Sequence, residues 1–266
     1  MSTTQVAIHG AAGRMGQRLI ALGHADSELT IAAALENSSH PKIGQDAGVI
    51  AGIGEINLPL AASPDQVAID ALIDFSVPEA TDSVIELCVS RKIALVMATT
   101  GLSDAQQENL RQASESIAVV WAPNMSLAVN LTMKLATIAA EILKQNSAGV
   151  DVEILERHHR YKEDAPSGTA LKFGELIAEV MGQTNSAHGR EGRPGVRPRD
   201  EIGYHAVRVG DNPGEHTIIF GMLGETIELR VGATNRDCYA LGALAAARFA
   251  ATQKPGMYNM YDVLGL

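Results

Sequence analysis

The stretch Val6-Ala7-Ile8-His9-Gly10-Ala11-Ala12-Gly13-Arg14-Met15-Gly16 decides the fold of the first half of the chain. Its first three residues are an apolar run that predicts a short strand, and residues 14–22 have the apolar spacing of a helix. Three glycines, at positions 10, 13 and 16, lie in and just after the turn between them. Glycine lets an anion approach the backbone, and a helix N-terminus offers it free N–H groups and partial positive charge. The stretch therefore predicts a dinucleotide-binding turn; the alternative is a tight turn that serves packing alone.

Further apolar runs follow at 29–35, 69–75, 93–97 and 117–121. Helices are expected between them, one beginning near Pro78 and another behind a cap at Ser103. Strands that are apolar almost throughout belong to parallel sheets covered by helices on both faces. The first 125 residues therefore predict an α/β fold, a Rossmann-like doubly wound parallel sheet.

The pattern changes after residue 125. A long helix is expected over 126–145, with a stripe at Leu127, Leu131, Leu135, Ile138 and Ile142. The remaining expected elements are an alternating strand at 150–154, a helix at 167–181, a Gly/Arg/Pro-rich loop at 184–200, a hairpin at 216–220 and 226–231, and a helix at 237–250. This order predicts a C-terminal α+β domain with an open mixed sheet over 126–236, and 237–266 is expected to return to the first domain.

Composition limits the classes of function. The chain has 266 residues, 46% of them hydrophobic, and a formal charge of −10 from 21 Lys+Arg and 31 Asp+Glu. A phosphate backbone would repel such a molecule, so nucleic acid is not an expected partner. No secretion signal or membrane span is predicted, and Cys88 and Cys238 give no disulfide framework or zinc spacing. We expect a cytoplasmic protein with no metal site and no membrane partner.

Glu36 ends the second predicted strand, 20 residues after Gly16. A carboxylate at this place accepts hydrogen bonds from the ribose hydroxyls of NADH and repels the 2′-phosphate of NADPH. The next residue, Asn37, is neutral, and the nearby cations are His40 and Lys42. NADH is therefore favoured and NADPH remains possible; a surface glutamate that closes a strand is the alternative.

Three more turns follow predicted strands, at 75–78, 98–101 and 122–125. Ligands of open α/β sheets bind outside the carboxyl ends of the strands, so these turns are expected to lie around the nicotinamide.

A cationic segment stands out in this acidic chain. Residues 157–162 hold three formal cations and two imidazoles without an acid. Ser167 is a fair helix N-cap, and the N–H groups of Gly168 and Thr169 would be free in the first helical turn. The segment predicts a pocket for a small dicarboxylate, and the alternative is a solvated basic turn. A cationic pocket facing a nicotinamide suits reduction of a carboxylate-bearing imine or unsaturated acid, with a histidine or lysine as proton donor.

Four motifs make the expectation more specific. They are Gly-Ala-Ala-Gly-Arg-Met-Gly at 10–16, Ala-Thr-Thr-Gly at 98–101, Ala-Pro-Asn-Met-Ser at 122–126 and His-His-Arg-Tyr-Lys-Glu-Asp-Ala-Pro-Ser-Gly-Thr-Ala at 158–170. Together they resemble the dihydrodipicolinate reductase family, as do shorter segments at 190–192, 202–203, 208–211 and 214–217. The resemblance covers nearly the whole chain, and the last of the four motifs is the most specific.

The resemblance implies an enzyme that reduces 4-hydroxy-2,3,4,5-tetrahydrodipicolinate to tetrahydrodipicolinate with NADH or NADPH, in the diaminopimelate route of lysine biosynthesis. It implies that His158 is the proton donor and acceptor, that Lys162 is the second proton donor and that His159 binds substrate. The implied carboxylate cradle is Ser167, Gly168 and Thr169. The implied nucleotide contacts are Gly10, Ala11, Ala12, Gly13, Arg14, Met15, Glu36, Ala98, Thr99, Thr100, Ala122, Pro123, Asn124 and Met125. The family is typically homotetrameric through the second domain, which implies that 126–236 binds substrate and assembles the oligomer.

The chain departs from the family pattern at three places. Asn37 stands where an arginine is frequent, and Val77 and Met125 stand where some members have arginine and phenylalanine. Two other functions remain open. One is a different nicotinamide-dependent amino or imino acid dehydrogenase, which would share the first domain but has no need of the 158–169 motif. The other is an NAD(P)-sensing protein without catalysis, against which the intact His158 and Lys162 argue.

Overall fold

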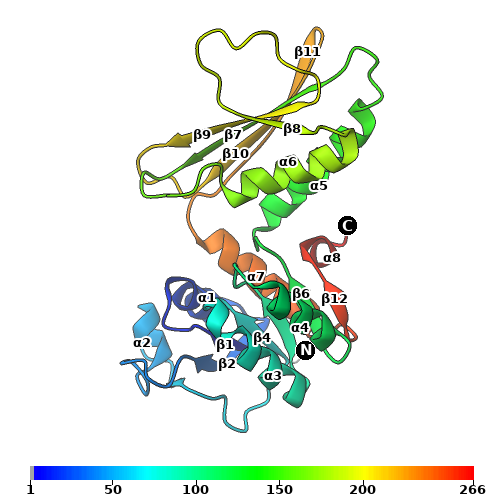
Figure 1. Ribbon diagram of the computed structural model, residues 1–266. Coiled ribbons are helices and arrows are strands. Elements are labelled where there is room, and N and C mark those ends of the chain that lie inside the picture. Colours follow the sequence, from blue (N-terminus) through cyan, green and yellow to red (C-terminus); the bar gives the residue numbers. More distant parts are fainter. Residues whose placement is uncertain (1–2) are drawn as a thin grey trace. The chain divides into compact units, whose positions relative to one another are not determined.

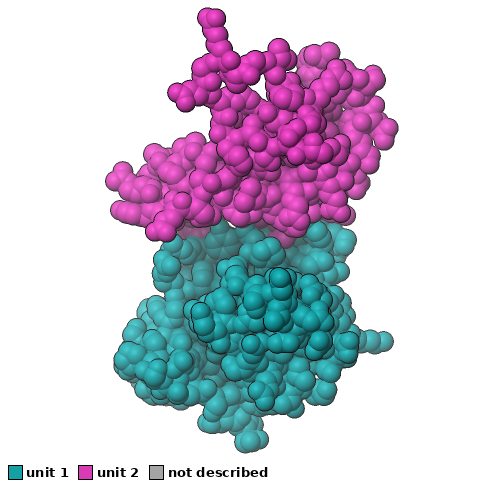
Figure 2. All heavy atoms as spheres, in the orientation of Figure 1, with its two compact units in different colours: residues 1–127, 236–266 teal, residues 128–235 magenta. Residues whose placement is uncertain are grey.

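A computed structural model describes residues 3–266 of the chain. The chain divides into two compact units, shown in different colours in Figure 2. Unit 1 comprises the residues up to 127 together with 236–266, and unit 2 comprises 128–235. From the sequence, we expected the domain boundaries after residues 125 and 236, and the units of the structure divide after residues 127 and 235.

Unit 1 is built on a seven-stranded sheet in the order β12-β6-β5-β4-β1-β2-β3, in which every neighbouring pair is parallel. The strands are β1 (Thr4–His9), β2 (Leu29–Leu35), β3 (Leu60–Ala61), β4 (Ala71–Asp74), β5 (Ala94–Met97), β6 (Ala118–Trp121) and β12 (Gly256–Tyr258). The helices are α1 (Arg14–Ala25), α2 (Ala47–Ala51), the short 3₁₀ helix η1 (Pro78–Ala80), α3 (Thr81–Arg91), α4 (Asp104–Ser114), α7 (Asp237–Ala250) and α8 (Met260–Leu264). The predicted doubly wound α/β fold is confirmed.

Both faces of this sheet are covered, which explains the almost wholly apolar strands. In β1, Val6 and Ile8 belong to a core shared with α1 and α7, whereas Ala7 belongs to a second core shared with α3 and α4. All three side chains are fully buried. Successive residues of a strand point to opposite faces, so a strand between two helical layers needs an apolar residue at every position.

Helix α7 packs very closely against the chain that follows β6. A Cβ on Gly242 of α7 would lie 1.7 Å from the carbonyl oxygen of Met125, so only glycine allows this approach. The helix predicted for 237–250 is confirmed at both ends. The elements α2, β3, β12 and α8 were not expected, because they have two to five residues each and are too short for a periodic pattern.

Unit 2 contains a five-stranded mixed sheet in the order β11-β10-β7-β9-β8. Its strands are β7 (Asp151–His158), β8 (Asn185–His188), β9 (Glu201–Arg208), β10 (Glu215–Met222) and β11 (Glu225–Gly232), and its helices are α5 (Leu127–Leu143) and α6 (Gly168–Met181). β10 is antiparallel to both β7 and β11, and β9 is parallel to both β7 and β8. Figure 1 shows the two helices on the same side of the sheet. The expected open mixed sheet and hairpin are confirmed.

Three expectations for unit 2 are corrected. The strand expected at 150–154 continues to His158, because the alternation of buried and exposed residues continues to that position. The segment expected to be a loop at 184–200 contains β8, and β9 was not expected at all. In α5 the large side chains of the predicted stripe are largely exposed, including Leu135 and Ile142, whereas the buried side includes Met133, Ala136 and Ala140.

None of the helices in residues 3–266 is long and apolar enough to cross a membrane.

Candidate functional site

The glycine turn of unit 1 needs glycine for steric reasons. Gly10 has φ +76°, and a Cβ there would lie 2.8 Å from the carbonyl oxygen of Phe75. A Cβ on Gly16 would lie 2.2 Å from the carbonyl oxygen of Gly10, so the first turn of α1 rests directly on the turn before it. Gly13 is the N-cap of α1 and supplies no side chain to the helix N–H groups. The turn therefore leaves bare backbone donors at a helix N-terminus, which fits a pyrophosphate.

Glu36 lies against this turn. It follows β2, and its carboxylate accepts the N–H groups of Ala12 at 3.2 Å and Asn37 at 3.0 Å. Gly10 and Ala11 both donate their N–H groups to the carbonyl oxygen of Leu35. The structure thus brings the predicted acid and the predicted glycine turn together, with a negative charge at the place where a ribose would extend from the pyrophosphate.

The remaining predicted residues of the turn are more open. Arg14 is exposed and Met15 is half-buried in the first turn of α1.

A buried carboxylate connects the next two turns. Asp74, the last residue of β4, is fully buried and accepts hydrogen bonds from His9 Nδ1 at 2.7 Å, Ser76 Oγ at 2.6 Å and Thr99 Oγ1 at 2.8 Å. Thr99 Oγ1 in turn accepts the N–H of Ser76 at 3.0 Å. The ends of β1, β4 and β5 are therefore fixed by one acid, which sequence reasoning missed. The hydroxyl of Thr99 is engaged in this network and so holds the turn after β5 in place.

The last predicted turn follows β6. Ala122 and Met125 are buried, Pro123 is exposed, and Asn124 Oδ1 accepts the N–H of Ser126 at 2.9 Å. Ala98, which follows the neighbouring β5, is buried and donates its N–H to the carbonyl oxygen of Asp74, whereas Thr100 is exposed. Because β1, β4, β5 and β6 are adjacent and parallel, all these turns lie at the same edge of the sheet.

In unit 2 the predicted proton donor lies on the covered face of β7. His158 is 8% exposed, and its Nδ1 lies 2.6 Å from Oε2 of Glu156, which is 2% exposed. An ionised carboxylate only accepts hydrogen bonds, so Nδ1 carries the proton of this pair and Nε2 is left for a ligand. Gly214, whose φ is +146°, leaves space beside His158 Nε2, because a Cβ on this residue would lie 2.9 Å from that nitrogen.

The surroundings of His158 set its charge. Burial lowers the pKa of His158 below its usual 6.5, the hydrogen bond and charge of Glu156 raise it, and the cations Lys162 and Arg208 lower it. Burial alone would raise the pKa of Glu156, but the hydrogen bonds from Arg208 and His158 outweigh it, and the pKa of this carboxyl lies below its usual range. Glu156 is therefore an anion beside His158, and the proton affinity of this imidazole is set by burial and by the charges around it.

Ser167 is confirmed as the N-cap of α6, with its Oγ accepting the N–H of Ala170 at 3.1 Å. The same Oγ lies 2.9 Å from Nε2 of His216 on β10. Burial is the main cause that lowers the pKa of His216 to about 4, and the nearby His158 lowers it further. This imidazole is therefore neutral near pH 7. The N–H of Ser167 is donated to Glu156 at 3.0 Å.

The groups of Ser167 are therefore used within the protein. Gly168, which is exposed, and Thr169, which is half-buried, present the first turn of α6. This is the part of the cradle that is best placed to meet a carboxylate.

The other predicted residues lie between β7 and α6. Lys162 Nζ pairs with Asp164 at 2.7 and 2.9 Å, and this contact lowers the pKa of the Asp164 carboxyl. His159 is half-buried, and its Nδ1 is buried with no hydrogen-bond partner within residues 3–266. A buried imidazole nitrogen that lacks a protein partner suits contact with a ligand.

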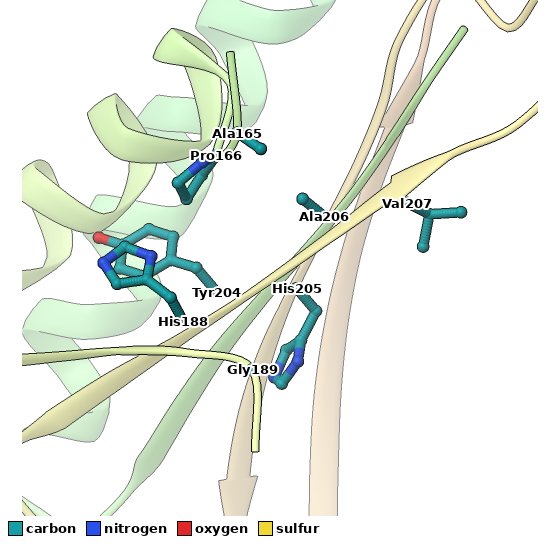
Figure 3. A pocket seen from close by; sticks show the side chains of 8 residues that line it. All are labelled: Ala165, Pro166, His188, Gly189, Tyr204, His205, Ala206 and Val207. Atoms are coloured by element: carbon teal, nitrogen blue, oxygen red, sulfur yellow. The ribbon is translucent and has the colours of Figure 1, made fainter. Parts of the chain in front are cut away.

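Unit 2 also has a hollow of about 410 Å³, which Figure 3 shows from close by. It lies where β8 ends at His188 while β9 continues beyond it. Its lining residues are Ala165, Pro166, His188, Gly189, Tyr204, His205, Ala206 and Val207. None of these is a lysine or arginine, His188 stacks on Tyr204, and His205 is paired with Glu153. The hollow therefore lacks the charge that a dicarboxylate needs, and the cluster around His158 has it.

Sequence reasoning missed three residues of this cluster: Glu156, Arg208 and His216. One signal was available for Glu156, because it is two residues before His158 on an alternating strand and so occupies a core-facing position. An acid facing a core needs a partner, which points to a site. Arg208 and His216 lie on other strands, within the segments 208–211 and 214–217 that resemble the family. Their contacts with Glu156 and Ser167 follow only from the order of the sheet.

Among residues 3–266 there is no group of three or more His, Cys, Asp or Glu residues arranged to hold a metal ion.

A parallel sheet with a glycine turn and an acid after its second strand, joined to a unit that carries a histidine–carboxylate pair beside a capped helix, defines a nicotinamide-dependent oxidoreductase with two domains. Family models agree over nearly the whole length: the dihydrodipicolinate reductase N-terminus matches residues 4–125 and its C-terminus matches 128–264. The chain belongs to the dihydrodipicolinate reductase family.

Two curated relatives carry the name 4-hydroxy-tetrahydrodipicolinate reductase. The protein from Rhodopirellula baltica is 58% identical over 266 residues, which cover 97% of this chain and 95% of the relative. The protein from Alkalilimnicola ehrlichii is 47% identical over 270 residues, which cover 99% of this chain and all of the relative.

Solved structures support the fold. A dipicolinate-bound dihydrodipicolinate reductase from Paenisporosarcina sp. TG-14 aligns with a TM-score of 0.79 at 24% identity and covers 98% of both chains. An amine dehydrogenase from Mycobacterium smegmatis aligns with a TM-score of 0.63 at 11% identity, over 98% of this chain and 95% of the other.

The buried carboxylate of unit 1 gives a testable prediction. Replacing Asp74 with asparagine (Asp74→Asn) puts an NH₂ group among donors, so at least one hydrogen bond of the network is lost. We expect unit 1 to lose about 1–3 kcal/mol of stability and its affinity for NADH to fall. Denaturant unfolding and NADH titration measure the two effects. Asp82→Asn, at an exposed position of α3, is the control, and equal behaviour of the two variants would contradict the role of Asp74.

Proposed function

We propose that this chain catalyses the NAD(P)H-dependent reduction of 4-hydroxy-2,3,4,5-tetrahydrodipicolinate to 2,3,4,5-tetrahydrodipicolinate, in the diaminopimelate route of lysine biosynthesis. The observation that carries the proposal is the His158–Glu156 pair beside the N-terminus of α6, in a chain that matches the reductase family from end to end. The Paenisporosarcina reductase holds dipicolinate, a dicarboxylate with the same charge and ring framework as this substrate.

In this proposal the reduced nicotinamide supplies a hydride when it is bound, the protein supplies a proton, and the 4-hydroxyl group of the substrate leaves as water. His158 presents Nε2 to the substrate, because its Nδ1 is held by Glu156. A positioned imidazole of this kind contributes about 10²–10⁴-fold to a rate. Lys162 is the second proton donor, and its pairing with Asp164 holds the ammonium group near the site. His159, Gly168 and Thr169 bind the carboxylates of the substrate, and Ser167, whose own N–H and Oγ are engaged within the protein, holds this end of the cradle in place. The cationic side chains favour a dianion.

The residues proposed for the cofactor are those of the turns in unit 1: Gly10, Ala11, Ala12, Gly13, Arg14, Met15, Glu36, Ala98, Thr99, Thr100, Ala122, Pro123, Asn124 and Met125. We favour NADH, with NADPH possible. The support is Glu36, whose carboxylate contacts Ala12 of the glycine turn and would repel a 2′-phosphate, together with the neutral Asn37 beside it.

We also propose that the domain at 126–236 assembles a homotetramer and that the enzyme works in the cytoplasm. Leu155, Val207 and Ile227 are large apolar residues of the unit 2 sheet that remain exposed in a single chain. Their exposure on three strands of one sheet supports the proposal that a second copy of the chain covers this sheet. Cys88, which is buried, and Cys238, which is half-buried, are both thiols rather than halves of a disulfide, as in proteins of reducing compartments.

Consumption of NADH tests the proposal. The purified chain is mixed with NADH, with and without freshly generated 4-hydroxy-tetrahydrodipicolinate, and absorbance of the reduced nicotinamide is followed. Substrate-dependent loss of NADH is expected. If NADH binds but is not consumed, a sensing protein is the better account, and consumption with other amino or imino acids alone would favour a different dehydrogenase.

The proposed proton donor makes a sharper prediction. His158→Gln is expected to lower kcat by about 10²–10⁴-fold while the Kd for NADH stays within about twofold, because the glycine turn and His158 belong to different units. Steady-state kinetics and NADH titration give the two numbers. His188→Gln, at an exposed histidine of the same unit, is the control and should retain activity. An equal loss of NADH affinity would show that His158 has been wrongly assigned.

The cofactor proposal predicts a change of preference in Asn37→Arg. A cation beside Glu36 can pair with a 2′-phosphate, so the ratio of kcat/KM for NADPH to that for NADH should rise by about tenfold, equivalent to one charge-assisted hydrogen bond of ~1.5 kcal/mol. Gln112→Arg adds the same charge at an exposed position of α4 and should leave the ratio unchanged. An unaltered ratio in Asn37→Arg would contradict the assignment of Glu36.

A further inference from the structure

Glu156 has a symmetrical set of partners. Its Oε2 accepts from His158 Nδ1 at 2.6 Å and from Arg208 Nη1 at 2.7 Å. Its Oε1 accepts from the N–H of Ser167 at 3.0 Å and from Arg208 Nη2 at 2.8 Å. Each oxygen thus has one donor from the same arginine and one donor from the proposed site. The carboxylate is 2% exposed, so its geometry is set by these four donors and not by water.

Arg208 holds the carboxylate in a fixed plane. A guanidinium that binds both oxygens of a carboxylate fixes its rotation as well as its distance. Arg208 Nη2 also donates to the carbonyl oxygen of Asp164 at 2.6 Å, which attaches the end of β9 to the segment that contains Lys162. With its rotation fixed in this way, Glu156 directs one oxygen to His158 and the other to Ser167.

The two directed contacts have different consequences. The contact with His158 keeps the proton on Nδ1 in the neutral imidazole and stabilises the imidazolium. The contact with Ser167 fixes the N-cap of α6 and with it the direction of the backbone N–H groups in the first turn of that helix. One side chain therefore sets the geometry of both the proton donor and the carboxylate cradle.

We infer that Glu156 is a positioning residue that joins the proton donor to the carboxylate cradle, so that a substrate carboxylate seated on α6 places the reacting atom at His158 Nε2. The inference rests on the proposed role of His158. Glu156 itself takes no part in the chemistry: its effect on kcat passes through His158, and its effect on the cradle passes through Ser167 and appears in the KM for the substrate.

The charged and titratable groups that face His158 determine how removal of the Glu156 charge would act on pH dependence. They are Glu156 of its own strand, Lys162 of the following loop, Arg208 of β9 and His216 of β10. Glu156 is the one anion among these four groups. Without that charge the imidazolium is less stable, so the protonated donor is lost at a lower pH. The limb of the kcat profile on which activity falls with rising pH should move to lower pH in Glu156→Gln.

A double-mutant cycle tests the inference. Glu156→Gln alone is expected to lower kcat by about 10²-fold, because the amide has no charge to stabilise the imidazolium and its single oxygen cannot accept from both His158 and Ser167. In the His158→Gln background the same substitution should change kcat by less than about threefold, since the residue through which it acts is already gone. Glu153→Gln is the matched control: it lies on the same strand with arginine partners, and it should leave the pH limb in place.

A measurement on the unaltered chain avoids the risk that Glu156→Gln folds poorly. Nitrogen NMR of the chain labelled in histidine reports which ring nitrogen carries the proton. The inference expects Nδ1–H for neutral His158, and Nε2–H would overturn it. The inference would also be overturned if the fold loss of kcat in the double variant equalled the product of the losses in the two single variants, because Glu156 would then act independently of His158.

The outcomes separate this inference from the proposed function. If the wild-type chain does not consume NADH with the substrate, the proposed function fails. If the wild-type chain is active and His158→Gln is slow, but Glu156→Gln retains the wild-type rate and pH limb, only the inference fails. NADH affinity and thermal unfolding of each variant confirm that unit 1 is intact.

Discussion

The bidentate contact between Arg208 and Glu156 is the interaction on which the unit 2 site depends. A chain with a formal charge of −10 has to build a positive pocket locally, and a cluster of cations repels itself unless an anion lies among them. Glu156 is that anion, and burial strengthens its interactions because little water screens them. The same carboxylate also accepts from the start of α6, so this pair fixes both the local geometry and the local charge of the site.

Unit 1 follows a similar principle. Asp74 is a buried acid at the end of a strand, and it fixes the following turns through His9, Ser76 and Thr99. In both units a carboxylate inside the protein arranges groups that we propose to bind ligands. Buried acids of this kind are costly unless fully hydrogen-bonded, and here every oxygen of both has donors. We interpret them as the elements that hold the proposed ligand contacts in place before a ligand arrives.

Much of the fold could be predicted from sequence, and the reasons are physical. Strand β2 and helix α7 were predicted at both ends, because their apolar patterns are long and unbroken. Strand β9 was missed, because its partner β7 is distant in sequence and because buried and exposed residues do not alternate regularly along it. Four of the five residues of the α5 stripe proved exposed, all except Leu127, since periodicity shows that a helix has an apolar side but not what covers it. The roles of His158, Lys162 and the cradle stay predictions, and Glu156 needed the sheet order to reveal Arg208 as its partner.

The central claim is that the cluster around residues 156–169 is built for two negative charges. Calorimetric titration of the NADH-bound chain with pyridine-2,6-dicarboxylate and with pyridine-2-carboxylate tests it most directly, because the two ligands share a ring and differ by one carboxylate. The account predicts that the dicarboxylate binds at least tenfold more tightly, as expected when one further charge-assisted hydrogen bond of ~1.5 kcal/mol forms. Equal affinity for the two ligands would contradict it.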